Sequence, residues 1–234
     1  MFIANQITES VLFAAALLPP VCVLLFVYRL DKLEKEPVSL LIRLFFRGVI
    51  AVLPIIALEL VGQVIAQSLG YSQQFQLFLL YFIIPGFVEE GVKYWTLKRN
   101  TWYEPNFDSR FDAIVYAAFI SLGFAAVENV NYVLSTGLTT AIVRAVLAIP
   151  GHMAFAVIMG HYYAKAKQAE LSGNPYTARK YSKRAWLYAA ILHGLYDYIL
   201  IAYGGWYFAL YFAALIIFAL KLLLTSSEKD GPIK

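Results

Sequence analysis

The chain has 234 residues, of which 61% are hydrophobic and only 15% are charged, with a formal net charge of +4. An ordinary soluble domain contains roughly 45–50% apolar and about 25% charged residues, so this composition excludes a soluble globular protein. The apolar residues gather in blocks of about 20, the length that crosses a hydrocarbon core of roughly 30 Å. We therefore expect an all-α polytopic membrane protein whose single transmembrane domain covers residues 1–234.

Hydropathy divides the chain into a bundle of about seven transmembrane helices, with eight as the alternative. The positive charges lie between the apolar blocks rather than in one basic patch, so we expect the lipid bilayer as a partner and no nucleic acid. The predicted spans are residues 9–28, 41–67, 76–97, 112–134, 141–164, 186–203 and 206–224.

Lys and Arg are distributed unevenly among the connections. Loops 29–40, 98–111 and 165–185 are rich in these residues, whereas connections 68–75 and 135–140 contain none. The N-terminal segment and the short connection before the last span also lack them. Because Lys and Arg concentrate in cytoplasmic loops, the pattern predicts an extracytoplasmic N-terminus and a cytosolic C-terminus, as an odd number of spans requires.

Several ionisable residues lie inside the predicted spans, where a charged side chain costs about 2.5–3.5 kcal/mol on insertion scales. Glu59 stands alone in the second span, and a bond to a neighbouring helix explains it as well as a functional role does. The residues in question are Glu59, Glu89, Glu90, Lys93, Asp112, Glu128, Arg144, His152, His193 and Asp197.

Helical spacing pairs several of these groups. Glu89 and Glu90 lie four and three residues before Lys93, so one ammonium can partly neutralise two carboxylates. His193 and Asp197 are also four residues apart, which lets the carboxylate hold one imidazole nitrogen while the other faces a reactant.

Depth in the bilayer brings residues of different spans together. At about 1.5 Å of rise per residue, Glu89, Glu128, His152 and His193 come between the middle of the membrane and its outer half. Arg144 lies near the level of Glu128. Lys93 and Asp112 lie closer to the cytosol and are expected as supporting residues.

Two Pro-Gly pairs stand beside these polar residues, at positions 85–86 and 150–151. Backbone groups freed by a helix break inside a membrane must be satisfied by protein or water. The breaks therefore favour a small wet cavity next to Glu89 and His152.

Two kinds of chemistry fit these residue types. In the first, which we prefer, a Glu acts as general base for a water while histidines stabilise the oxyanion and protonate the leaving amine, with no metal cofactor. In the second, Zn²⁺ is held by His152, His193 and a carboxylate such as Glu128, and Glu89 is the base. The chain contains no HExxH motif, so these residues allow a zinc site but do not specifically indicate one.

Five short motifs resemble those of the PrsW-type intramembrane proteases. These proteases are similar to the wider superfamily of CAAX prenyl endopeptidases and bacteriocin-processing proteins. The motifs span nearly the whole chain and occur in the family's order. They are EKEP at 34–37, EEGVK at 89–93 for EExxK, FAAVEN at 124–129 for FxxxEN, GHMA at 151–154, and HGLYD at 193–197 for HxxxD.

The resemblance implies a multi-pass protease of the bacterial plasma membrane. Its substrate would be a membrane-anchored anti-sigma factor, cut at site 1 in regulated intramembrane proteolysis during a stress response. Many members of the wider superfamily have His where this chain has Glu128, which keeps the zinc alternative open. The implied catalytic residues are Glu89, Glu90, His193, His152 and Glu128, supported by Lys93, Asp197, Asn129, Arg144 and Asp112.

Two other classes of protein use buried Glu and His. A proton-coupled transporter uses them as relays, although no inverted repeat is visible in this chain. A non-catalytic membrane scaffold uses them to bind a partner. The sequence also leaves open which of Glu89 and Glu90 activates water, because the two side chains point about 100° apart on a helix.

Overall fold

The computed structural model describes the backbone of residues 2–233 and the side chains of residues 9–233. Within that range the chain is helical, and seven stretches are long and apolar enough to cross a membrane, which confirms the predicted all-α architecture with seven spans. The helices are α1 (Phe2–Leu30), α2 (Val38–Ser68), α3 (Gln73–Phe78), α4 (Ile84–Thr101), α5 (Asp112–Thr136), α6 (Leu138–Val146), α7 (Ala148–Leu171), α8 (Pro175–Ala202) and α9 (Gly205–Glu228), with a π-helical turn, η1, at Leu79–Ile83.

Two of the spans are broken next to polar residues. The third consists of α3, η1 and α4, with Pro85 in the first turn of α4, where its missing N–H is no loss. The fifth is broken at Leu147, between α6 and α7, three residues before Pro150. Both breaks therefore come shortly before a buried polar residue, Glu89 in the third span and His152 in the fifth.

The sixth span is longer than predicted. Helix α8 begins at Pro175 rather than near residue 186, with the Asn174 side chain accepting a hydrogen bond from the backbone N–H of Thr177 at 3.0 Å. Hydropathy detects only the apolar part of a helix. The first turns of α8 carry basic residues and extend beyond the apolar block.

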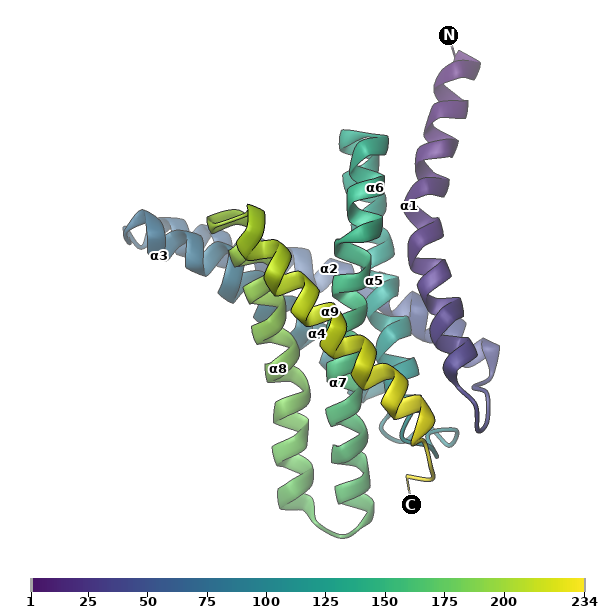
Figure 1. Ribbon diagram of the computed structural model, residues 1–234. Coiled ribbons are helices and arrows are strands. Elements are labelled where there is room, and N and C mark those ends of the chain that lie inside the picture. Colours follow the sequence, from purple (N-terminus) through teal and green to yellow (C-terminus); the bar gives the residue numbers. More distant parts are fainter. Residues whose placement is uncertain (1, 234) are drawn as a thin grey trace.

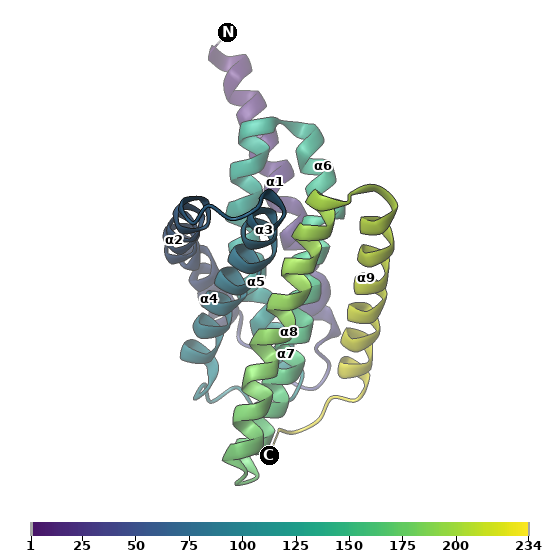
Figure 2. The same ribbon diagram turned by 90° about the vertical axis from the view of Figure 1, so that its left-hand side faces the viewer.

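Helices α5 and α7 form the centre of the molecule (Figures 1 and 2). Helix α5 packs against α1, α2 and α7, while α8 packs against α7 and α4. Helix α2 crosses behind this bundle at a steep angle: it runs across the view of Figure 1 and is seen end-on in Figure 2. Its 31 residues correspond to about 46 Å, long enough to cross the hydrocarbon at a strong tilt.

A pair of glycines brings α4 and α8 into backbone contact. A Cβ atom at Gly86 would lie 2.5 Å from the carbonyl oxygen of Ala190, and one at Gly194 would lie 2.4 Å from the carbonyl oxygen of Phe82. Small residues allow this approach because membrane helices associate by close packing rather than by a hydrophobic force. Glu90 lies one turn after Gly86, and His193 directly precedes Gly194, so this close approach brings the two side chains together.

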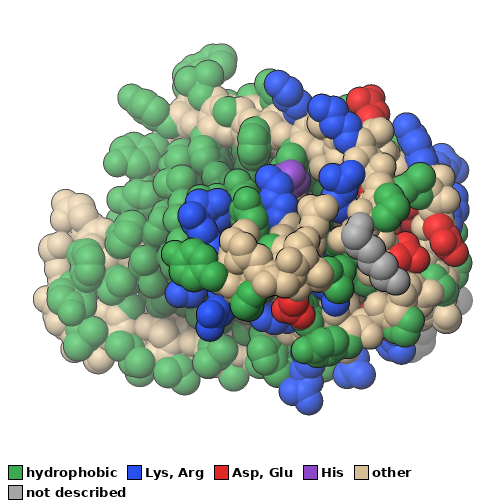
Figure 3. All heavy atoms as spheres, turned by 90° about the horizontal axis from the view of Figure 1, so that it is seen from below, with side chains coloured by type: hydrophobic (Ala, Val, Ile, Leu, Met, Phe, Trp, Pro, Cys, Tyr) green, Lys and Arg blue, Asp and Glu red, His purple; other side chains and the backbone are tan. Residues whose placement is uncertain are grey.

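One end of the molecule gathers most of the basic side chains (Figure 3). The α1–α2, α4–α5 and α7–α8 connections and the C-terminal segment all lie at this end (Figure 1). The remaining surface exposes large apolar side chains, such as Leu53 of α2 and Leu210 of α9, each 70% exposed. Such a surface suits lipid. The protein is thus a multi-pass membrane protein.

Two carboxylates are buried in the α1–α2 connection, outside the spans. Burial raises the pKa of Glu36 to about 8, with a further contribution from the neighbouring carboxylate of Asp112. Burial also raises the pKa of Asp31 to about 6, an effect that Lys35 partly offsets. Neither oxygen of Asp31 has a hydrogen-bond partner within the described part of the chain.

These shifts predict a pH-dependent stability. Because the pKa of Glu36 is about 8 in the folded protein and 4.5 in its ordinary range, the folded state keeps a proton that the unfolded state loses. Stability therefore falls between about pH 4.5 and pH 8, by a few kcal/mol at about 1.4 kcal/mol per pKa unit. Glu36→Gln should abolish most of that fall in titrations from mild detergent into dodecyl sulfate, followed by circular dichroism.

The exposed Glu34 in the same connection provides the control. Glu34→Gln should leave the pH profile as in the parent protein. A Glu36→Gln variant that loses stability between pH 4.5 and pH 8 as steeply as the parent would contradict a buried, protonated Glu36.

Candidate active site

The EEGVK motif lies in the middle of α4 and forms a buried ion triad. Glu89, Glu90 and Lys93 are 6%, 0% and 1% exposed, respectively. The Lys93 Nζ donates to Glu89 Oε2 at 2.9 Å and to Glu90 Oε1 at 2.8 Å. The i, i+4 and i, i+3 spacings thus place both carboxylates on one ammonium, as the sequence predicts.

His193 of α8 lies against the same carboxylates. Its Nδ1 is 3.0 Å from Glu90 Oε1 and 3.8 Å from Glu89 Oε2, and its Nε2 is 3.4 Å from Asp197 Oδ2. The ring stacks on Phe155 at a centroid distance of 4.7 Å. Asp197 therefore holds one nitrogen as expected, whereas the other meets Glu90 and Glu89 rather than an open cavity.

His152 of α7 is held by Glu128 of α5, with 3.0 Å between its Nε2 and the Glu128 Oε2. The same carboxylate oxygen forms an ion pair with Arg144 of α6 at 2.9 Å. Arg144 Nε in turn donates to Asn129 Oδ1 at 2.8 Å, and Asn129 Nδ2 donates to the backbone carbonyl of Ala16. This chain of contacts ties α1, α5, α6 and α7 together beside the imidazole.

Lys93 joins the two histidine clusters. Its Nζ lies 3.4 Å from His152 Nδ1 and 4.1 Å from the ring centroid of Phe124. The FAAVEN motif of α5 therefore contributes an aromatic face to the ammonium, a carboxylate to His152 and an amide to Arg144. The motifs of α4, α5 and α7 therefore meet at this lysine, and that of α8 joins them through Glu89 and Glu90.

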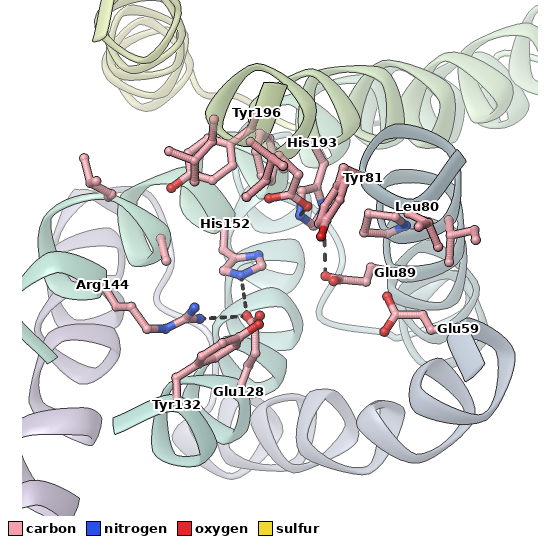
Figure 4. Close-up of a pocket in the computed structure, with 18 of the residues that line it drawn as sticks. Glu59, Leu80, Tyr81, Glu89, Glu128, Tyr132, Arg144, His152, His193 and Tyr196 are labelled. Carbon is pink, nitrogen blue, oxygen red and sulfur yellow. Dashed lines mark hydrogen bonds and ion pairs between the residues drawn. The ribbon is translucent and has the colours of Figure 1, made fainter. Parts of the chain in front are cut away.

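A cavity of about 420 Å³ opens beside these residues (Figure 4). Glu89, His152 and His193 line it, whereas Glu90 does not, so the glutamate that the cavity reaches is Glu89. Its other walls come from α2, η1, α5, α6 and α8. Figure 4 shows Tyr81, Tyr132 and Tyr196 around its rim.

One expected residue lies outside the cavity, and two residues that the sequence analysis does not name line it. Asp112, expected as a supporting residue, accepts hydrogen bonds from the backbone N–H and Oγ of Ser109 and from the backbone N–H of Asp108, at the start of α5. Tyr81 and Tyr132 line the cavity without any motif to signal them. The only sequence signal for Tyr132 is its spacing of four residues from Glu128.

Three of the lining side chains could together hold a metal ion. Glu89, His152 and His193 each offer one ligand atom, and these atoms lie within 4.8 Å of one another. Two imidazoles and one carboxylate form a donor set that zinc uses in catalytic sites. The carboxylate that meets both imidazoles is Glu89, whereas Glu128, expected as the third ligand, contacts only His152 of the two.

The fold and the site define a multi-pass helical membrane protein with buried Glu, His and Lys side chains beside a cavity. The comparisons with known proteins specify the class further. Residues 36–224 match the family model described as "PrsW family intramembrane metalloprotease". The chain belongs to the PrsW family and is an intramembrane protease.

Curated relatives named "Protease PrsW" support this assignment. The chain is 37% identical to that of Geobacillus kaustophilus over 90% of this chain and 89% of the relative. It is 35% identical to that of Clostridioides difficile, over 93% and 90% of the two chains, and 34% identical to that of Bacillus subtilis, over 83% and 85%. No solved structure shows significant similarity to the chain.

The central position of Lys93 leads to a stability prediction. Replacing it by Met leaves two carboxylates buried without their cation, and breaking a buried pair in this way costs about 3–5 kcal/mol. We expect Lys93→Met to lower the free energy of unfolding by that amount in a detergent titration. Adding Glu90→Gln should restore part of the loss, since it removes one of the orphaned charges.

Lys98 on the same helix is exposed and serves as the matched control. Lys98→Met should change stability by less than about 0.5 kcal/mol. If Lys93→Met were as stable as Lys98→Met, the ion triad would not hold the site together.

Proposed function

We propose that the protein hydrolyses a peptide bond of a single-span membrane protein inside this cavity. The observation that carries the proposal is the meeting of Glu89, His152 and His193 at one cavity next to the ammonium of Lys93. Family membership favours this reading over the transporter and scaffold alternatives that the sequence leaves open.

Glu89 is the proposed general base because it is the glutamate that the cavity reaches. It takes a proton from a water while the water oxygen adds to the carbonyl carbon of the scissile bond. The carbon–nitrogen bond then breaks, and the proton passes to the leaving amine. Glu90, which is fully buried, positions Lys93 and His193 rather than contacting the substrate.

The histidines and Lys93 stabilise the negative charge of the tetrahedral intermediate. Both rings line the cavity, and an imidazole N–H that is directed at a carboxylate in the free protein would be shared with the oxyanion once the substrate is bound. The ammonium of Lys93 adds a fixed positive charge within a water-poor site, where electrostatic interactions are strong. The bonds of His152 to Glu128 and of His193 to Asp197 fix both rings in orientation.

Zinc fits the same residues in donor type and spacing. Glu89, His152 and His193 would hold the ion, which would polarise the scissile carbonyl and lower the pKa of a bound water. Lys93 Nζ, however, already lies 2.9 Å from the Glu89 carboxylate and 3.4 Å from His152 Nδ1. Because this ammonium neutralises the donors, we propose catalysis by Glu89 and the histidines without a resident metal.

The proposed substrate is an anti-sigma factor cut at site 1 of regulated intramembrane proteolysis. Two features support a cut near the extracytoplasmic face. The first is the basic end of the molecule, which the positive-inside rule assigns to the cytosol in the proposed orientation, with the N-terminus outside and the C-terminus inside. The second is the place of the cavity along the helices. The cavity is lined by Tyr132, Leu200 and Ile201, near the ends of α5 and α8 that lie away from the basic end.

Replacement of the proposed base tests this function. Glu89→Gln keeps the size of the side chain but cannot accept the proton, so kcat for cleavage of a single-span substrate should fall by about 10²–10⁴-fold. Cleavage is followed by gel and mass spectrometry with purified protein, and membrane insertion and helicity should stay as in the parent.

Glu9→Gln removes an exposed carboxylate from the outer end of α1 and should cleave at the parental rate. His193→Ala should abolish cleavage as Glu89→Gln does. Full activity in a Glu89→Ala and Glu90→Ala double variant would eliminate this assignment of the site.

A further inference from the structure

Glu59 of α2 is a carboxylate of the cavity wall that the proposed chemistry does not use. Among the residues whose side chains the structure describes, it has no ion-pair or hydrogen-bond partner. The other carboxylates of the wall each have a basic partner: Glu89 with Lys93 at 2.9 Å, Glu128 with Arg144 at 2.9 Å, and Asp197 with His193 at 3.4 Å.

The face of α2 that carries Glu59 changes character where it passes the cavity. Ala51 and Ile55 are buried on this face and pack against Phe124 of α5. One and two turns further on, at the same i, i+4 spacing, come Glu59 and Gln63, both of which line the cavity. The helix thus switches from packing to a polar row at the cavity, while its other faces expose apolar side chains.

The neighbours of Glu59 in sequence show that this polar row is local. Leu58 and Leu60 are 50% and 57% exposed on a span that faces lipid. An ionisable residue inside such a span normally faces a cavity and has a partner. Figure 4 shows the Glu59 side chain directed into the cavity, on the same side as Glu89. The Glu59 carboxyl group is therefore accessible to a group that enters the cavity.

The charges of the wall indicate what that group is. Four carboxylates line the cavity, against one guanidinium, that of Arg144, and the adjoining ammonium of Lys93. The two cations are already engaged by Glu128 and Glu89. Glu59 adds a carboxyl group with no basic partner among the described side chains, and a cation that enters a partly water-poor site interacts with a carboxylate more strongly than in bulk water.

We propose that Glu59 binds a lysine or arginine side chain of the substrate, close to the scissile bond and on its extracytoplasmic side. This specificity role rests on the proposed proteolytic function and deepens it. Glu59 lies nine residues before the outer end of α2, which ends at Ser68. A long basic side chain just outside the substrate's span can reach that level while its aliphatic stem lies along apolar surface.

A charge-swap experiment tests the proposal. Three synthetic single-span peptides, each with about 20 apolar residues, differ only near the outer end of the span. The first carries Lys there, the second Gln and the third Glu. The purified protein should favour the Lys peptide over the Gln peptide, both in kcat/KM and in equilibrium binding. Glu59→Gln should lower this preference at least 10-fold, mainly through KM, and Glu59→Lys should shift it toward the Glu peptide.

Glu9→Gln, which removes an acid outside the cavity, is the matched control and should keep the parental preference. A Glu59→Gln variant with an unchanged preference would overturn the proposal, as would an equal loss on all three peptides, which indicates a structural role. The binding measurement separates the proposed role of Glu59 from the proposed proteolytic function. Absence of cleavage with a Glu59-dependent binding preference refutes the proteolytic function and leaves the basic-residue site standing.

Discussion

A single ammonium inside the membrane is the constraint around which the site is built. Lys93 bonds both glutamates of its own helix and lies 3.4 Å from His152 of another. Without it, two carboxylates would be buried beside each other at a large desolvation cost. With it, Glu90 can orient His193, and the Glu89 carboxylate is held in a fixed position at the cavity.

The packing of the other helices brings the residues of this site together. Glycines at positions 86 and 194 let α8 approach the backbones of α4 and η1, so that Glu90 of α4 can bond to His193 of α8. The breaks before α4 and α7 end regular helix where the cavity forms. Broken helices inside a membrane occur where the freed backbone borders protein or water, and here they border the cavity.

Much of this organisation can be predicted from sequence because the underlying signals are local. Hydropathy marks the seven spans, and helical spacing pairs Lys93 with its glutamates and His193 with Asp197. What cannot be predicted depends on how helices rotate and pack. The contact of the second His193 nitrogen with Glu90 and the approach of Lys93 to His152 follow from three-dimensional packing alone.

The most direct measurement is to incubate the purified protein with a single-span substrate in H₂¹⁸O and a chelator, then identify the fragments by mass spectrometry. Hydrolysis by a water at Glu89 predicts a cut in the outer half of the span, one ¹⁸O atom in the new carboxylate, and a rate unaffected by the chelator. A cut on the cytosolic side, or no cut, would contradict a hydrolytic site in this cavity. Loss of cleavage on chelation, restored by zinc, would contradict its metal-free chemistry.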